Sequence, residues 1–249
     1  MLNELEQAFE PELAGLKHHQ VRSVVTFIIR ELAPKEIVFM PSSSTGTHHP
    51  QDERVLGGWV MHGKRVVLMC KHLARVFDLP SYETDVLVAA AIVHDLYQYG
   101  DGHITLLGQL KTGHLKTDVS HAAKLAEDIV GSELLVSCNY AETIVLREIA
   151  DTVRWHSGRW GSERDGENFS RALAHVWEKG GSPPSKLGFI LHLADYVASR
   201  DSITVDISYD HPAWEKRVKW PVQREGKIKV ITGHPGSLYE YKRSRAKEA

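Results

Sequence analysis

Apolar residues recur at helical spacing along most of the chain. They form one stripe between residues 59 and 77, whereas residues 82–95 are apolar on nearly every face, which is typical of a buried helix. Five further helical segments are predicted at residues 3–33 (broken at Pro11), 118–130, 140–156, 168–179 and 185–200. The Pro-, Ser- and Gly-rich residues 41–58 and the Gly-rich residues 98–117 are predicted to be loops.

The pattern changes after residue 200. The segments VKWPV and KIKVITG favour two short strands, joined as a hairpin around Glu225-Gly226. We therefore predict an all-α helical bundle with a small β-containing C-terminal extension. Its expected parts are an N-terminal helical segment with a Ser-rich loop (1–58), a helical domain (59–200) and the extension with a basic tail (201–249).

The amino-acid composition and net charge argue against several classes of protein. The 249 residues are 42% hydrophobic and 25% charged, with a net charge of -2, which argues against a strongly basic nucleic-acid binder or a polybasic membrane protein. The first residues are acidic and lack the apolar stretch of a signal peptide, and no apolar run reaches the ~20 residues of a membrane span. Only two cysteines are present. We expect a cytoplasmic protein with no membrane partner.

The predicted buried helix ends in His94-Asp95. An imidazole and a carboxylate placed in a core are costly unless they are paired or bound to a metal. His62 lies on the inward stripe of the preceding helix, and Asp195 lies within the apolar segment ILHLADYVA. These residues could be satisfied core hydrogen-bond partners, but a divalent metal with nitrogen and oxygen ligands explains all of them together.

The same residues resemble a known family. The segments HGKRV at His62, VAAAIVHDL at His94-Asp95 and LHLADYVAS at Asp195 are similar, in order, to the H…HD…D pattern of the HD-domain metal-dependent phosphohydrolases. The resemblance covers about residues 59–200 and implies an HD-domain helical bundle. It implies a first metal on these four residues.

Binuclear members of that family have two more histidines between the HD pair and the last aspartate. His121 opens a predicted helix and His156 ends another, in the expected order. The resemblance therefore implies a second metal on these histidines, with Asp95 as the bridging ligand. The other interpretation is a solvated His121 and a His156 that caps its helix.

The resemblance implies hydrolysis of a phosphomonoester or phosphodiester of a nucleotide or a nucleic-acid-derived molecule, by water that a metal activates. One or two divalent ions (Mn, Fe, Co, Ni, Mg or Zn) would serve as cofactors. Asp95, Lys111 and Arg159 are the expected catalytic residues, and Lys64, Arg65 and Lys116 are further candidates to bind phosphate, although each cation could be a solvated surface charge. Ser42 to Thr45 could also bind phosphate or form only a linker.

Two other functions stay open. The same six ligands could hold a di-iron oxygenase centre. Alternatively, the chain could be a non-catalytic nucleic-acid-binding module with a structural metal, because the residues from His211 onward carry ten Lys/Arg against four Glu, interleaved with aromatic residues. That region can equally be a solvated face, which we favour. The sequence does not indicate an oligomeric state.

Overall fold

A computed structural model describes residues 4–42, 49–99, 103–104, 110–111, 120–131, 139–158, 185–200, 203, 205, 207, 219–224 and 227–232. The chain forms two compact units that interleave along the sequence. The first contains Met1–Pro34, Val66–Gln98 and Leu115–Val197, and the second contains Lys35–Arg65, Tyr99–His114 and Ala198–Ala249. The predicted consecutive domains stay a prediction.

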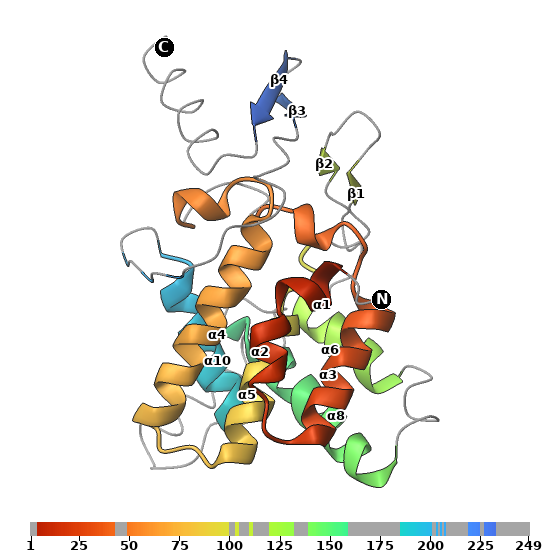
Figure 1. The fold of residues 1–249 in the computed structure, drawn as a ribbon, viewed down its shortest axis with the longest axis vertical. Coiled ribbons are helices and arrows are strands. Elements are labelled where there is room, and N and C mark those ends of the chain that lie inside the picture. Colours follow the sequence, from red (N-terminus) through yellow and green to blue (C-terminus); the bar gives the residue numbers. More distant parts are fainter. Residues whose placement is uncertain are drawn as a thin grey trace. The chain divides into compact units, whose positions relative to one another are not determined.

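The first unit is helical (Figure 1). Its helices are α1 (Glu4–Ala8), α2 (Glu10–Ala14), α3 (His19–Leu32), the part of α4 (Gly58–Val76) from Val66 onward, α5 (Ser81–Val93), α6 (His121–Gly131), α8 (Tyr140–Trp155) and α10 (Lys186–Ala198). Helix α8 packs against α3, α5 and α6 through a face that includes Val145, Ile149 and Val153. In α5 the nine residues from Asp85 to Val93 are buried, as the all-round apolar pattern predicts.

Capping residues and a proline explain where some of these helices begin and end. Asn139 and Glu142 form a capping box at the start of α8: each side chain accepts the other residue's backbone N–H, at 3.0 and 3.1 Å. Ser120 Oγ accepts the Ala123 N–H at 3.2 Å and so caps α6, one of the two caps predicted there. Helix α3 ends at Leu32 because Ala33, which precedes Pro34, is extended.

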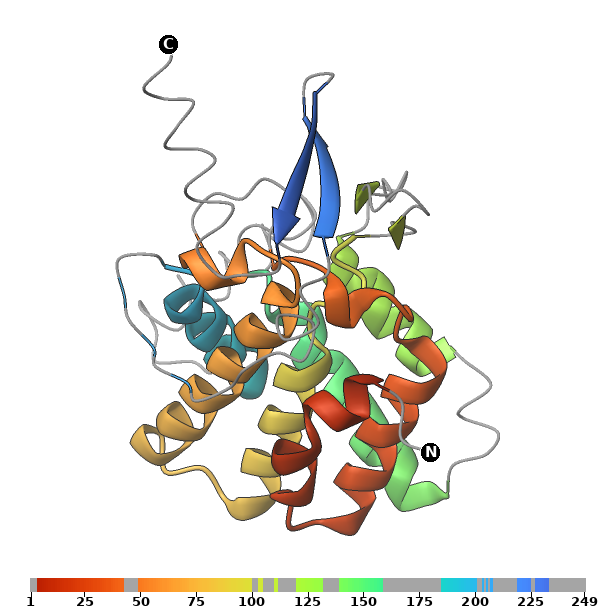
Figure 2. The same cartoon turned by 45° about the horizontal axis from the view of Figure 1, so that its top comes forward.

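The second unit holds the 3-10 turns η1 (Ile37–Phe39) and η2 (Gln51–Glu53) and the first residues of α4, up to Arg65. Strand β1 (His103–Ile104) pairs antiparallel with β2 (Leu110–Lys111). Strand β3 (Lys219–Arg224) pairs antiparallel with β4 (Lys227–Thr232), in a register from Lys219↔Thr232 to Arg224↔Lys227 (Figure 2). The β-containing extension as a part of the fold class stays a prediction.

The structure corrects three of the predicted segments. The helical segment predicted at residues 3–33 is broken at Pro11, which stands in the first turn of α2, but it has a second, unpredicted break at residues 15–18, between α2 and α3. The predicted loop at 98–117 contains β1 and β2, and the predicted loop at 41–58 contains η2. The predicted helix at 168–179 lies outside the described residues. Among the described helices, none is long and apolar enough to cross a membrane.

A buried carboxylate joins α5 to the turn that precedes α3. Asp85 Oδ2 accepts the backbone N–H groups of Lys17 and His18 at 2.7 and 2.8 Å, and His18 Nδ1 lies 2.7 Å away. Two backbone donors and one imidazole therefore depend on this one oxygen, and they lose their acceptor together if the carboxylate is removed.

We expect Asp85→Ala to lower the free energy of unfolding by about 2 kcal/mol, because buried donors lose their acceptor. Urea denaturation measures this. The matched control is Glu83→Ala. Glu83 lies on α5 like Asp85, and the substitution removes its half-exposed ion pair with Lys186 of α10, which should cost less than about 1 kcal/mol. Equal losses in the two variants would contradict this explanation.

Candidate metal centre

Four helices of the first unit bring chemically active side chains to one place. His94 is the C-cap of α5, and Asp95 follows it directly. His156 is the C-cap of α8, His121 is the first residue of α6, and Asp195 lies in α10. His94, Asp95 and His156 are buried, whereas the side chains of His121 and Asp195 are 29% and 24% exposed. The cluster is thus built into the core and open to solvent on one side.

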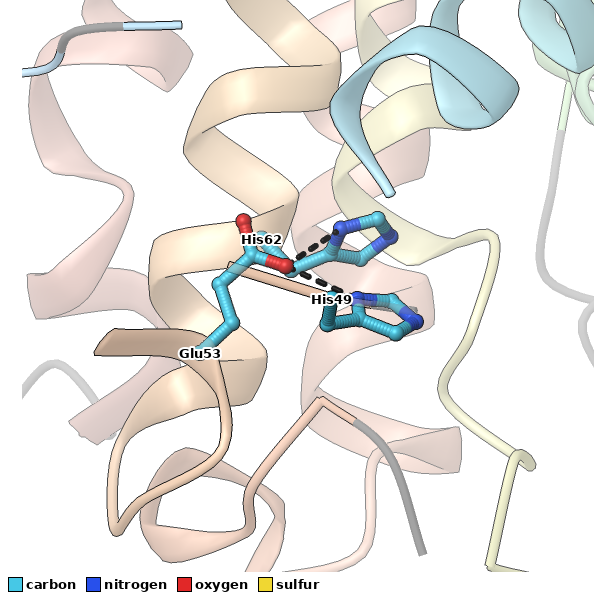
Figure 3. A group of neighbouring side chains, drawn as sticks. All are labelled: His49, Glu53 and His62. Carbon is cyan, nitrogen blue, oxygen red and sulfur yellow. Dashed lines mark hydrogen bonds and ion pairs between the residues drawn. The ribbon is translucent and has the colours of Figure 1, made fainter. Parts of the chain in front are cut away.

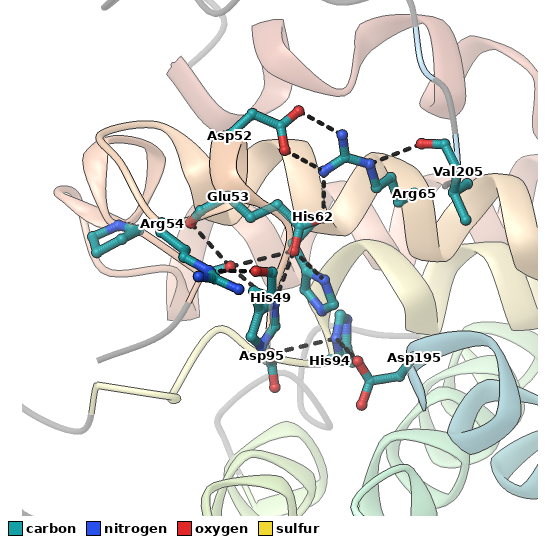
Figure 4. Close-up of polar contacts among 12 residues, drawn as sticks. His49, Asp52, Glu53, Arg54, His62, Arg65, His94, Asp95, Asp195 and Val205 are labelled. Atoms are coloured by element: carbon teal, nitrogen blue, oxygen red, sulfur yellow. Dashed lines mark hydrogen bonds and ion pairs between the residues drawn. The ribbon is translucent and has the colours of Figure 1, made fainter. Parts of the chain in front are cut away.

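Asp95 is the centre of this cluster. Its Oδ1 lies 3.0 Å from His121 Nε2 and 3.3 Å from His156 Nε2. Its Oδ2 lies 3.4 Å from His94 Nε2, and that nitrogen is 4.0 Å from Asp195 Oδ1 (Figure 4). One carboxylate oxygen therefore faces two histidines, and the other faces the third histidine.

The helix ends fix the orientation of two imidazoles. His94 Nδ1 lies 2.8 Å from the carbonyl oxygen of Ala91, and His156 Nδ1 lies 2.7 Å from that of Val153. Because a carbonyl oxygen only accepts, each Nδ1 must carry the proton. Both Nε2 atoms then face Asp95, and each can donate its lone pair to a metal once it carries no proton.

The arrangement fits a divalent cation. His121 Nε2 and His156 Nε2 lie only 3.3 Å apart, and two lone pairs at that distance repel each other unless a proton or a cation lies between them. Ligand atoms of His94, Asp95 and His156 all lie within 4.8 Å of one another. Ligands about 2.1 Å from a metal are spaced by roughly 3–3.4 Å, close to the separations found here.

The neighbours of Asp95 and His156 shift the pKa values of both side chains. Burial alone raises the pKa of the Asp95 carboxyl, but the neighbouring His94 and the hydrogen bonds from His121 and His156 outweigh it and hold this pKa well below its usual range. Burial lowers the pKa of His156, and the bond to Asp95 more than reverses that effect. Asp95 is therefore an ionised carboxylate at neutral pH, as a metal ligand must be.

Comparison with known families agrees with the cluster. The family profile of the HD domain matches residues 60–200, more than half of the chain. The chain belongs to the HD domain family. This confirms the resemblance to the HD-domain metal-dependent phosphohydrolase superfamily. Comparisons with curated proteins and with solved structures gave no match. His94-Asp95 is the one His-Asp dipeptide within the matched residues, and its assignment as the HD pair of the domain stays a prediction.

A second cluster of the same residue types lies in the second unit (Figure 3). His62, in the second turn of α4, is buried as predicted, and its Nδ1 lies 3.3 Å from Glu53 Oε2. His49 Nδ1 lies 2.8 Å from the same oxygen. Burial alone raises the pKa of Glu53, but the neighbouring His62 and the hydrogen bond with His49 bring it down to about 2.

The predicted site residues fall into three groups. The first unit brings together His94, Asp95, His121, His156 and Asp195. His62 belongs to the second unit, so its place in the ligand set stays a prediction. The side chain of Lys111, on β2, and the whole of Lys116 and Arg159 lie outside the described residues.

Two of the candidate phosphate-binding residues have other roles. Arg65 is bound to the carboxylates of Asp52 and Glu53 and to a backbone carbonyl oxygen, so its guanidinium is occupied within the protein. Ser42 Oγ donates to the Glu53 carbonyl oxygen at 3.0 Å and also contacts His49. The candidates Ser43, Ser44 and Thr45 lie outside the described residues.

Sequence reasoning missed Glu53 and His49. Both lie in residues 41–58, which were interpreted as a loop because of their proline, serine and glycine content. The signal that could have identified them is the density of ionisable residues in HHPQDER, seven residues with two histidines, two acids and an arginine just before the His62 helix.

Gly158 leaves room for the side chain that contacts the His156 backbone. Gly158 has a φ of 54°, and a Cβ there would lie 2.5 Å from His192 Cε1. His192 Nδ1 in turn lies 2.8 Å from the carbonyl oxygen of His156. A side chain at position 158 would therefore displace the residue that holds the His156 backbone.

We expect Gly158→Ala to lower the free energy of unfolding by about 2 kcal/mol, from backbone strain and overpacking, and to weaken Mn²⁺ binding. Denaturation and calorimetric titration measure the two effects. Gly131→Ala is the control, since a Cβ there meets no atom within 4 Å. A stability loss without any change in Mn²⁺ affinity would show that His192 does not position His156.

Proposed function

We propose that this HD-domain protein is a phosphohydrolase that cleaves a phosphomonoester or phosphodiester bond with divalent metal ions. The observation that carries the proposal is the convergence of His94, His121 and His156 on the two oxygens of Asp95. Mixed imidazole and carboxylate ligands suit Mn²⁺, Fe²⁺, Co²⁺, Ni²⁺ and Zn²⁺. Membership of the HD family supports the same chemistry.

Each residue has a defined part in this proposal. His94 and His156 supply neutral nitrogen ligands whose orientation the helix ends fix. Asp95 and Asp195 supply the negative charge that balances a divalent ion, and His62 is the remaining proposed ligand. When bound, the metal lowers the pKa of a water molecule and neutralises charge on the phosphoryl group. The exposed side of the cluster, at His121 and Asp195, admits substrate.

The two oxygens of Asp95 support a binuclear site. Because Oδ1 faces His121 and His156 while Oδ2 faces His94, the carboxylate is suited to bridge two ions, which we propose lie on its two sides. Lys111 and Arg159 are proposed to hold the phosphate, since phosphoryl transfer needs cations around the transferred group. The substrate is proposed to be a nucleotide or a nucleic-acid-derived molecule.

We expect metal-stripped protein to release phosphate from p-nitrophenyl phosphate, or to cleave bis-p-nitrophenyl phosphate, only after addition of a divalent metal. Asp95→Ala should reduce kcat/KM more than about 100-fold because the shared ligand is lost. Glu83→Gln, at an exposed ion pair, should keep wild-type turnover. Oxygen consumption with Fe²⁺, and no phosphate release from these esters or from nucleotides, would favour an oxygenase and contradict the proposal.

We expect His156→Ala to reduce the metal content by one ion, from about two per chain to about one, because the remaining site keeps His94 and Asp195. Inductively coupled plasma mass spectrometry after removal of weakly bound metal measures this. His121→Ala should have the same effect. If wild-type protein saturates with a single ion, the binuclear part of the proposal is wrong.

A further inference from the structure

The carboxylate of Glu53 lies fully buried among charged and polar groups of the second unit. One of its oxygens, Oε2, faces Nδ1 of both His49 and His62, at 2.8 and 3.3 Å (Figure 3). The other oxygen, Oε1, accepts from Arg65 Nη1 at 2.5 Å. The two sides of one carboxylate are therefore used differently: one oxygen is anchored, and the other contacts imidazoles.

The backbone around Glu53 is held tightly. The Glu53 carbonyl oxygen accepts from Ser42 N at 2.8 Å and from Ser42 Oγ at 3.0 Å. Gly58, the first residue of α4, approaches that carbonyl so closely that a Cβ would lie 2.0 Å from its oxygen. The 3-10 turn η2 and the start of α4 are thus packed against each other, and the position of Glu53 relative to His62 is set by backbone contacts.

Arg65 anchors the carboxylate from the other side. Its guanidinium binds both oxygens of Asp52 and Oε1 of Glu53, and its Nε donates to the Val205 carbonyl oxygen at 2.9 Å (Figure 4). A guanidinium with three engaged nitrogens holds the carboxylate in one orientation and keeps it ionised. An ionised carboxylate only accepts, so the 3.3 Å contact of Oε2 with His62 Nδ1 is favourable when that nitrogen carries the proton.

His62 needs such a partner because of its place in the helix. His94 and His156 stand at helix C-termini, where backbone carbonyl oxygens are available to hold Nδ1. His62 stands near the start of α4, where the backbone carbonyl oxygens are used within the helix. A side-chain acceptor is therefore required to fix this imidazole, and Glu53 supplies it.

We propose that Glu53, held by Arg65, is a positioning residue that fixes His62 in the Nδ1-protonated tautomer and so aims its Nε2 at a metal ion. This inference rests on the proposed function, which makes His62 a ligand. His49 donates to the same oxygen and helps to hold the carboxylate in place. Glu53 itself is not a metal ligand, since Arg65 already balances its charge.

The first test measures Mn²⁺ affinity by calorimetric titration. Glu53→Gln should weaken binding about 10- to 100-fold, the range known for partners of metal-binding histidines, with the number of bound ions unchanged at saturation. Activity should recover largely at saturating Mn²⁺. The matched control is Asp52→Asn, because Asp52 binds the same arginine but contacts neither His49 nor His62; its affinity should change less than about threefold.

The outcomes separate this inference from the proposed function. Wild-type Mn²⁺ affinity in Glu53→Gln, or equal weakening in Asp52→Asn, would overturn the positioning role. Loss of a bound ion in His49→Phe would also overturn it, because His49, Glu53 and His62 would then hold a cation directly.

A second measurement needs no metal. Nitrogen-15 histidine spectra of the metal-free protein should show His62 with its proton on Nδ1, and this signal should be lost or mixed in Glu53→Gln. An Nε2-protonated His62 in the wild-type protein would overturn the inference. The expected tautomer in a protein that binds no Mn²⁺ would overturn the proposed function and leave the positioning of His62 by Glu53 supported.

Discussion

The structure of the site depends on one buried carboxylate at the end of an apolar helix. Asp95 follows the all-round apolar helix α5, so its charge cannot be solvated as a surface carboxylate is. Three imidazoles from three different helix ends surround it. Each helix must therefore end or begin where it does, and a shift of one residue in α6 or α8 would rotate a histidine by about 100° away from the carboxylate.

Helix α8 has the most contacts that fix the position of its histidine. It contacts α3, α5 and α6, and a capping box at Asn139 and Glu142 fixes where it starts. Because an α-helix rises a fixed distance per residue, a fixed start and a buried face also fix the position of His156 at its end. Ligands carried on such packed helices are held more accurately than ligands on loops, which suits a site whose ligands must keep a defined geometry.

The sequence allowed much of this to be predicted, for identifiable reasons. An uninterrupted apolar run predicts α5 and its costly His94-Asp95 end, and helical stripes place His62 and His156. Glu53 could not be found in this way, because a single 3-10 turn has no periodicity. The role of Arg65 was equally hidden: a cation in the sequence looks the same whether it binds phosphate or two nearby carboxylates.

The direction of the helices adds to the electrostatics of the site. Helices α5 and α8 both end at the cluster, so the partial negative charge of two C-termini lies beside His94 and His156 and favours a cation there. The same carbonyl oxygens that produce this charge hold the Nδ1 protons of the two histidines. A ligand at a helix start has neither advantage. In the ligand role proposed for His62, the buried carboxylate of Glu53 would provide both, as an acceptor for Nδ1 and as nearby negative charge. A turn without helical periodicity would then take part in the chemistry of the protein.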